Sequence, residues 1–314
     1  MLFTIGLPIT KTKFLAETLE SISKQSYKDF ELIIRNNGAS QEIKDEIKSA
    51  CSSMLELPNV IYTESEKQLK MADNFNEIVK IANGKYITIL SDDDILHPHF
   101  LEEFHKLINR CPGPDVFHCR VKNINQDGEL IDYTELCPEF ENLPDFLYHR
   151  LMGIRRIVLS DFIVSTKALQ KIGGFPTFLK GWGVDTLTWY LLGNNGIAYT
   201  PEILLDYRIN SYNFTNNRNN LLIKLEDLVT IKDQKEKMIR SGEFKKQSPY
   251  PADFMLKLND KKFQINSKHI MWEICGANNP LRFLKLYRKY RRSHNLPGSY
   301  MYKLLHKKIL RIGF

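Results

Sequence analysis

The sequence predicts an α/β fold, with a mixed, mainly parallel sheet flanked by helices and a helical extension at the C-terminus. Two observations predict the sheet: short apolar runs alternate with amphipathic helical stretches, and an acidic cluster directly follows one of the apolar runs. A third observation predicts the extension, because strand patterns stop near residue 218. With 314 residues, of which 43% are hydrophobic, the chain can bury a full core.

The first half of the chain predicts βαβ units. Strand patterns cover residues 2–7, 30–34, 60–62 and 86–90, and helical patterns cover residues 14–24, 41–51, 71–82 and 99–109. Polar turns separate them, as at Asn83-Gly84. This order predicts a largely parallel sheet.

The second half predicts a more mixed arrangement. Strand patterns cover residues 116–121, 130–133, 162–165, 196–199 and 204–208, and the second of these is expected to pair with the first around the turn Gln126-Asp127-Gly128. A helix is expected to begin at Asp185. From residue 219 onward the sequence reads as helical and basic, with breaks near 249–251 and 297–298.

The acidic cluster Ser91-Asp92-Asp93-Asp94 follows the strand pattern of residues 86–90. The carboxyl ends of strands are where open α/β sheets bind their ligands. Adjacent carboxylates there suit Mn²⁺ or Mg²⁺, which prefer oxygen ligands and leave positions for substrate phosphates. The alternative is that the aspartates only cap the following helix. The motif alone leaves both interpretations open.

Residues 86–96, with Asn74 and Gly84-Lys85 before them, resemble the donor-site segment of family 2 glycosyltransferases, which have the GT-A fold. Pro8 and residues 19–27 and 30–34 match the first βαβ unit of that family, and the resemblance spans residues 3–208. It implies an inverting, metal-dependent hexosyltransferase that uses a nucleotide diphosphate sugar, with UDP-sugars favoured. The implied acceptor is a glycan or a lipid-linked oligosaccharide in the synthesis of capsule, lipopolysaccharide or a similar bacterial polysaccharide.

The family's Asp-x-Asp motif falls on Ser91, Asp92 and Asp93, so a hydroxyl replaces the first carboxylate. The resemblance implies that Asp93 binds Mn²⁺ or Mg²⁺, that Asp92 lies near the donor ribose or the water shell of the metal, and that Asp94 caps the next helix. The other expected donor contacts are Pro8, Ile9, Asn36, Asn37 and Asn74.

The pair Asn36-Asn37 stands where the family often has two aspartates, and Ile9-Thr10 stands where it often has an aromatic residue and an asparagine. Asparagine amides can still hydrogen-bond a base or a ribose. An ordinary turn over residues 36–38 is the alternative.

Asp185 is the candidate general base, since the sequence from Gly173 to Asp185 resembles the family's glycine-phenylalanine turn followed by a Glu-Asp pair. Val184 replaces the glutamate. The resemblance implies that Asp185 takes the proton of the acceptor hydroxyl. The alternative role is a plain helix N-cap.

Two further residues are expected at the site. Trp182, flanked by glycines, would offer its ring to a sugar, although it could equally pack under its own loop. Arg208 falls where the family often carries Tyr-Arg-x-His near the diphosphate, with Asn210 in place of the histidine. A salt bridge between Arg208 and Asp206 is the alternative.

The expected organisation is a catalytic domain at residues 1–218, with a nucleotide-sugar half at 1–105 and an acceptor half at 106–218, followed by a basic helical extension at 219–314. From residue 275 to the end there are ten Lys and Arg and no Asp or Glu. This composition suits an anionic membrane surface, and packing on the catalytic domain is the alternative. No nucleic-acid-binding motif accompanies the charge.

The expected location is the cytoplasm, with peripheral attachment to the inner face of the plasma membrane, because no run of about 18 apolar residues and no leader is present. The five cysteines form no metal-ligand pattern. The losses at Ser91 and Val184 keep a second class of function open, a non-catalytic protein that binds nucleotides or carbohydrates.

Overall fold

The computed structural model describes residues 1–210, 213–215, 217–277, 287–288 and 291. Its strands are β1 Phe3–Ile9, β2 Phe30–Asn36, β3 Val60–Glu64, β4 Tyr86–Ile89, β5 Ile95–Leu96, β6 Val116–Ile124, β7 Leu130–Tyr133, β8 Phe140–Glu141, β9 Phe162–Ser165 and β10 Ile197–Arg208. Its α-helices are α1 Leu15–Ser23, α2 Gln41–Ala50, α3 Ser52–Leu55, α4 Met71–Ile81, α5 Phe100–Arg110, α6 Leu143–Met152, α7 Thr166–Lys171, α8 Val184–Leu192, α9 Leu221–Arg240, α10 Gly242–Gln247 and α11 Ala252–Ala277.

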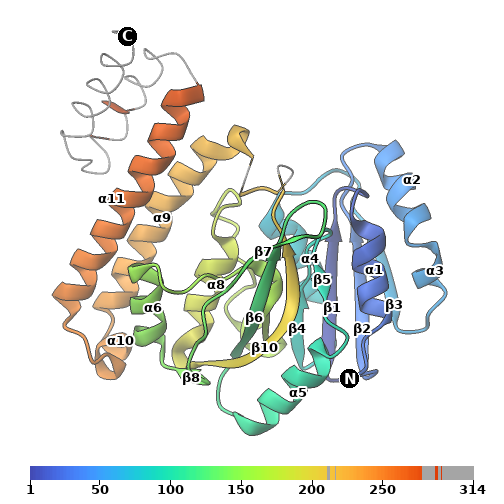
Figure 1. The fold of residues 1–314 in the computed structure, drawn as a ribbon, viewed down its shortest axis with the longest axis horizontal. Coiled ribbons are helices and arrows are strands. Elements are labelled where there is room, and N and C mark those ends of the chain that lie inside the picture. Colours follow the sequence, from blue (N-terminus) through green and yellow to red (C-terminus); the bar gives the residue numbers. More distant parts are fainter. Residues whose placement is uncertain (211–212, 216, 278–286, 289–290, 292–314) are drawn as a thin grey trace.

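One mixed sheet runs through the molecule in the order β3-β2-β1-β4-β9-β6-β10-β5 (Figure 1). The strands β3, β2, β1 and β4 run parallel to one another, β9 is antiparallel to both β4 and β6, and β6 is parallel to β10. The short strands β7 and β8 pair with β6 and β10. The predicted α/β class with a mainly parallel sheet is therefore confirmed.

The second half differs from the sequence prediction in two respects. The two strands expected at 196–199 and 204–208 are one long strand, β10, whose register against β6 shifts between Thr200 and Leu205. Pro201 lies at that irregularity, where a residue without an N–H is tolerated. Helix α6 was not predicted, although Asn142 caps it and Pro144 stands in its first turn.

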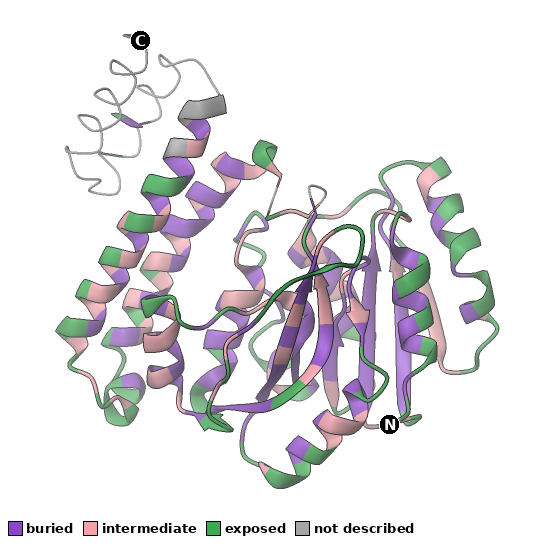
Figure 2. Cartoon of the chain, in the orientation of Figure 1, coloured by how far each residue is buried: buried purple, intermediate pink, exposed green. Residues whose placement is uncertain are grey.

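Apolar side chains fill both faces of the sheet, and the strands at its centre are mostly buried (Figure 2). On one face, strands β1 and β2 pack with helices α1, α2 and α5 in a cluster that includes Ile5 and Phe104. On the other face, helices α4, α6 and α8 cover the sheet in a cluster that includes Phe162 and Trp189. Ile239 of α9 belongs to this second cluster, so the C-terminal helices share the core of the sheet.

Helices α9 and α11 lie side by side along one flank of the molecule (Figure 1). Leu225 of α9 and Phe263 of α11 belong to a third apolar cluster between them. In the part of the chain that the structure describes, no helix is long and apolar enough to cross a membrane. Most of the basic tail, for which a membrane surface was expected, lies outside the described residues.

Candidate active site

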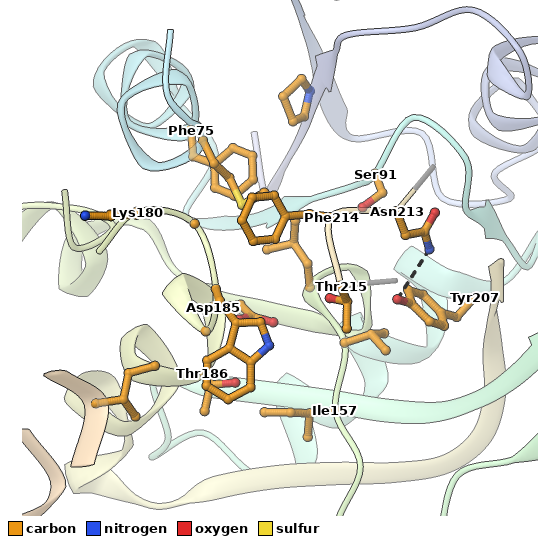
Figure 3. A pocket seen from close by; sticks show the side chains of 18 of the residues that line it. Phe75, Ser91, Ile157, Lys180, Asp185, Thr186, Tyr207, Asn213, Phe214 and Thr215 are labelled. Carbon is orange, nitrogen blue, oxygen red and sulfur yellow. Dashed lines mark hydrogen bonds between the residues drawn. The ribbon is translucent and has the colours of Figure 1, made fainter. Parts of the chain in front are cut away.

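The site begins where β1 and β4 end. These strands are neighbours and run parallel, so the loops after them meet at the same edge of the sheet. Thr10 and Lys11 follow β1, and the acidic cluster follows β4. A cavity of about 920 Å³ opens beside these loops and extends to helices α8, α9 and α11 (Figure 3).

Asp92 and Asp93 line this cavity, and the loop after β1 binds both of them. The Oδ2 atom of Asp92 accepts hydrogen bonds from the backbone N–H of Thr10 (2.9 Å), the Thr10 hydroxyl (3.2 Å) and the Lys11 N–H (3.3 Å). The Lys11 Nζ atom lies 3.1 Å from Oδ2 of Asp93 and 3.7 Å from Oδ1 of Asp92. Burial lowers the pKa of Lys11, but the two carboxylates more than offset this, and its pKa is raised. The ammonium group is thus held between two buried carboxylates.

The acidic cluster suits a divalent cation that takes only one or two of its ligands from the protein. No group of three His, Cys, Asp or Glu side chains in the described part of the chain could hold a metal ion. However, Mg²⁺ is commonly bound by one or two carboxylates together with substrate phosphates. The Lys11 ammonium shows that a cation is accommodated between Asp92 and Asp93. Asn210 donates a hydrogen bond of 3.0 Å to Oδ2 of Asp93.

Asp94 was expected to cap the next helix, but the structure gives it a different role. It is fully buried, accepts hydrogen bonds from the Ser160 hydroxyl (2.6 Å) and from the N–H of Arg208 (3.0 Å), and His99 is the N-cap of α5. Burial, with the charge of Asp93, raises the pKa of Asp94 to about 8. Asp94 therefore ties the loop after β4 to β10 and η1 (Leu159–Asp161).

Arg208 does not line the cavity, so its expected position beside the diphosphate is not supported. Side chains alternate along a strand, and Tyr207 is the residue of this pair that lines the cavity. The guanidinium of Arg208 donates to the Asp93 carbonyl (3.1 Å) and to Oε2 of Glu17 (2.7 Å), and it stacks on the Phe14 ring. It also has no salt bridge with Asp206, which pairs with Lys122 instead.

Because side chains alternate in this way, only some of the residues expected at the nucleoside face the cavity. Pro8 lines the cavity, whereas Ile9 is fully buried in the cluster with α1 and does not. Asn37 lines it, whereas Asn36 is fully buried and its amide donates to the Lys44 carbonyl (2.8 Å) and the Tyr62 hydroxyl (2.7 Å). Asn36 thus has a structural role.

Of the asparagines expected at the nucleoside, Asn37 and Asn74 line the cavity. Asn37 is bound to the chain after β3, because its Oδ1 accepts from the N–H of Leu69 (2.8 Å) and its amide donates to the Leu69 carbonyl (3.1 Å). Asn74 of α4 also lines the cavity, and its buried Oδ1 has no hydrogen-bond partner within the described chain. An unpaired buried acceptor of this kind is suited to a ligand donor.

Asp185 lies in the first turn of α8, behind the N-cap Gly183, and its carboxylate lines the cavity (Figure 3). Asp185 is therefore not the helix cap. Burial raises its pKa, and the charge of Arg150 opposes this rise. The fully buried Asp161 lies nearby. Burial raises the pKa of Asp161 well above its usual range, and the charge of Asp185 adds to this rise. A carboxylate with a raised pKa is a better proton acceptor.

Trp182 lines the cavity from the loop before α8 and is half-buried against two of the apolar clusters. Gly181 and Gly183 on either side have φ angles of +145° and +70°, which favour glycine. The buried Asp227 of α9 holds this loop, because its carboxylate accepts from the N–H of Lys180 (2.9 Å) and the N–H of Trp182 (2.8 Å). Trp182 therefore packs against the core and also lines the cavity, so both of the expected roles apply to it.

Several residues at the site were missed from the sequence. They are Lys11, Arg150, Tyr207, Asp227 and Lys235. The alternation along the last strand could have indicated Tyr207, because its neighbour Arg208 was singled out. No local pattern indicates the others, which reach the site only through packing of distant helices and loops.

Comparison with known proteins assigns the chain to a family. The family model described as glycosyl transferase family 2 matches residues 9–169, just over half of the chain. An uncharacterized glycosyltransferase of Methanocaldococcus jannaschii is 27% identical over 221 residues, which cover 68% of this chain and 70% of that protein. The amylovoran biosynthesis glycosyltransferase AmsB of Erwinia amylovora is 28% identical over 155 residues, covering 46% of this chain and 50% of AmsB.

Solved structures share the fold. TarS of S. aureus in complex with UDP-GlcNAc superposes with a TM-score of 0.61 at 15% identity, covering 84% of this chain and 72% of TarS. The mannosyltransferase PcManGT of Pyrobaculum calidifontis, in complex with GDP-Man and Mn²⁺, gives 0.56 at 14% identity, covering 96% and 83%. The fold is therefore GT-A-like, and with the family match this chain belongs to glycosyl transferase family 2.

Proposed function

We propose that this glycosyltransferase moves a hexose from a nucleotide diphosphate sugar, with UDP-sugars favoured, to a hydroxyl of a glycan or lipid-linked glycan. The transfer would invert the anomeric carbon. The observation that supports this most strongly is that Asp93 after β4 and Asp185 of α8 line one cavity together with Trp182. Tyr207 lines the same cavity, and burial raises its pKa, with smaller contributions from the charges of Asp94, Asp93 and Asp185.

In the proposed reaction, the acceptor oxygen attacks the anomeric carbon from the face opposite the diphosphate. Its proton passes to the carboxylate of Asp185. The bond between the anomeric carbon and the diphosphate oxygen breaks, and the electron pair leaves with the nucleoside diphosphate. Pro8, Asn37 and Asn74 would bind the nucleoside, and Asp92 would contact the ribose. Trp182 would hold the acceptor sugar against its ring.

The same proposal includes Mn²⁺ or Mg²⁺ held by Asp93, with the Ser91 hydroxyl at the same wall of the cavity. A bound divalent cation would offset the negative charge that grows on the leaving diphosphate. Lys11 now occupies the place between the carboxylates, so the ammonium group and a metal ion would compete for it.

The relatives support the class of substrate. TarS binds UDP-GlcNAc, PcManGT binds GDP-Man and Mn²⁺, and AmsB acts in amylovoran biosynthesis. We therefore propose a role in the synthesis of a surface polysaccharide such as a capsule or lipopolysaccharide. Ten basic residues after position 275 support a peripheral location at the cytoplasmic face of the plasma membrane.

The test combines nucleotide binding with turnover. Thermal shifts with UDP, GDP, CDP and dTDP, each with and without Mn²⁺, would identify the base. Release of nucleoside diphosphate from the matching sugar donors would then be measured for the wild type, Asp93→Asn, Asp185→Asn and the exposed control Asp127→Asn.

We expect both site variants to lose turnover and the control to keep it. Asp185→Asn should still bind the nucleotide, because the base does not hold the donor. Nucleotide binding without release of nucleoside diphosphate from any donor would refute the proposed transferase activity and favour a non-catalytic binding protein.

A further inference from the structure

Three cations gather at the end of the cavity that lies against the C-terminal helices. We call Arg150 of α6, Lys235 of α9 and Lys262 of α11 the basic subsite; all three line the same cavity as Asp185. Asn266, one turn after Lys262, lines it as well. The acidic residues that line this cavity are Asp92, Asp93 and Asp185, and none of them comes from α6, α9 or α11. None of these three helices contributes a carboxylate to the cavity, although the charge of Arg150 acts on Asp185 and on the buried Asp161.

Lys235 is the residue that most needs an explanation. Only 9% of it is exposed, and within the described part of the chain it has no hydrogen-bond or ion-pair partner. Burial, together with the positive charges of Arg150, Lys262 and Lys232, lowers the pKa of Lys235 to about 7. By contrast, Lys232 on the same helix pairs with Glu236 at 2.5 Å. A buried amine surrounded by cations destabilises the fold unless a ligand compensates for it.

Arg150 is oriented by its neighbours. Its Nη1 donates to the Arg155 carbonyl at 2.7 Å, its positive charge acts on the Tyr190 hydroxyl, and its buried Nε has no protein partner within the described chain. Lys262 has a simpler explanation available, since its Nζ lies near Gly153 at the C-terminal end of α6, where the helix dipole favours a cation. That explanation does not extend to Lys235, which remains unpaired.

We propose that the basic subsite binds an anionic group, a phosphate or a carboxylate, carried by the acceptor. This rests on the proposed transfer reaction and adds the acceptor class to it. The anion would lie among Arg150, Lys235 and Lys262, and the acceptor hydroxyl would then lie toward Asp185 in the same cavity. The donor diphosphate is a less suitable occupant, because the donor residues lie at the ends of β1 and β4.

Acceptor preference provides the main test. Neutral methyl glycosides, glycosides of uronic acids and sugar or polyol phosphates would be compared as acceptors in the wild type, Lys235→Met and Lys237→Met. Lys237 lies on the same helix but is exposed, so it is a matched control. We expect the wild type and Lys237→Met to prefer one anionic class at least tenfold. Lys235→Met should lose that preference through a higher KM for the anionic acceptor.

A binding measurement makes the result independent of turnover. With UDP saturating the donor site, sulfate at a concentration too low for general salt stabilisation should raise the Tm of the wild type and Lys237→Met but not that of Lys235→Met. Without sulfate, Lys235→Met should melt at or above the wild-type Tm, because it loses an unpaired buried charge while methionine keeps the apolar stem. Lys235→Gln serves as a second variant if the methionine protein does not fold.

The outcomes separate the two proposals. Equal use of neutral and anionic acceptors, or sulfate stabilisation that survives in Lys235→Met, would overturn the basic subsite. Loss of UDP binding in Lys235→Met would place the donor there instead and would overturn it too. Absence of donor hydrolysis and UDP binding in the wild type would contradict the transferase proposal, whereas the sulfate measurement, repeated without UDP, would still test the subsite.

Discussion

The surroundings of Asp185 change the pKa of its carboxyl group. Burial raises its pKa above the usual 3.8, Arg150 opposes that rise, and the buried Asp161 lies nearby. A base must be deprotonated to act, so kcat/KM should fall on the acid side as the pH drops through this raised pKa, at a pH above 3.8. The profile should be recorded with saturating donor and with a control that excludes acid unfolding.

Replacing Asp185 by asparagine removes the proton acceptor and should lower kcat by about 10²–10⁴-fold. The acid limb of the residual activity should also disappear, because asparagine does not titrate. A variant that keeps more than a tenth of the activity would show that another group takes the proton.

Under the proposed metal site, Lys11 would compete with the metal ion for the place between Asp92 and Asp93. In Lys11→Met the two carboxylates lose a cation that lies 3.1 and 3.7 Å away. We therefore expect Mn²⁺ to bind about tenfold more tightly, the equivalent of about 1.4 kcal/mol, because one unit of positive charge no longer opposes it. Calorimetric titration with Mn²⁺ should be done without nucleotide, so that attraction between Lys11 and phosphate plays no part.

The exposed Lys28 offers a matched control for this titration, since Lys28→Met removes the same charge away from the cavity. An unchanged or weaker Mn²⁺ affinity in Lys11→Met would mean that the ion does not bind between these carboxylates.

At the scale of elements, helix α9 controls the loop that carries Trp182. The Asp227 carboxylate accepts two backbone N–H groups of this loop, those of Lys180 and Trp182. Asp227→Ala leaves both partly buried donors without this partner, and a hydrogen bond to a charged group contributes about 1.5–3 kcal/mol. The free energy of unfolding in urea should fall accordingly, and the KM for the acceptor should rise while UDP binding is retained.

Glu226 is the natural control for Asp227, because it is its neighbour on α9 and forms an ion pair with Lys180 nearer the surface. Glu226→Ala should change the free energy of unfolding by less than about 1 kcal/mol, as is usual for surface pairs. Equal effects of the two variants on the acceptor KM would contradict the role assigned to Asp227.

The elements of the first half could be predicted because local pattern determines them. The strand of residues 86–90 is mainly apolar, and the acidic cluster after it lies at the sheet edge as predicted. Adjacent residues at a strand end were harder to assign. Ile9, Asn36 and Arg208 were expected at the ligand, but each lies one position from the residue that lines the cavity. The resemblance to the family locates two adjacent residues at a strand end. Which of the two faces the cavity depends on the orientation of the strand, which the resemblance does not give.

At the scale of the whole molecule, the cavity joins parts that the sequence keeps far apart. Lys11 follows the first strand, Asp185 lies in the middle of the chain, and Lys235 lies in α9. The family model ends at residue 169, before both Asp185 and Lys235. The residues that line the cavity from α8, α9 and α11 thus lie beyond the part of the chain that the family model matches.

This arrangement predicts that the proposed catalytic domain, residues 1–218, does not fold alone. Ile231, Ile239, Phe244 and Met255 are all buried in the cluster that covers one face of the sheet. Removing them exposes their partners on α6 and α8, at about 1.5–3 kcal/mol for each large side chain, against a total stability of about 5–15 kcal/mol. A chain ending at residue 218 should therefore be insoluble or show no cooperative melting by circular dichroism. A chain ending at residue 277 keeps these contacts and should melt cooperatively. Cooperative melting of the 1–218 chain would instead support two independent domains.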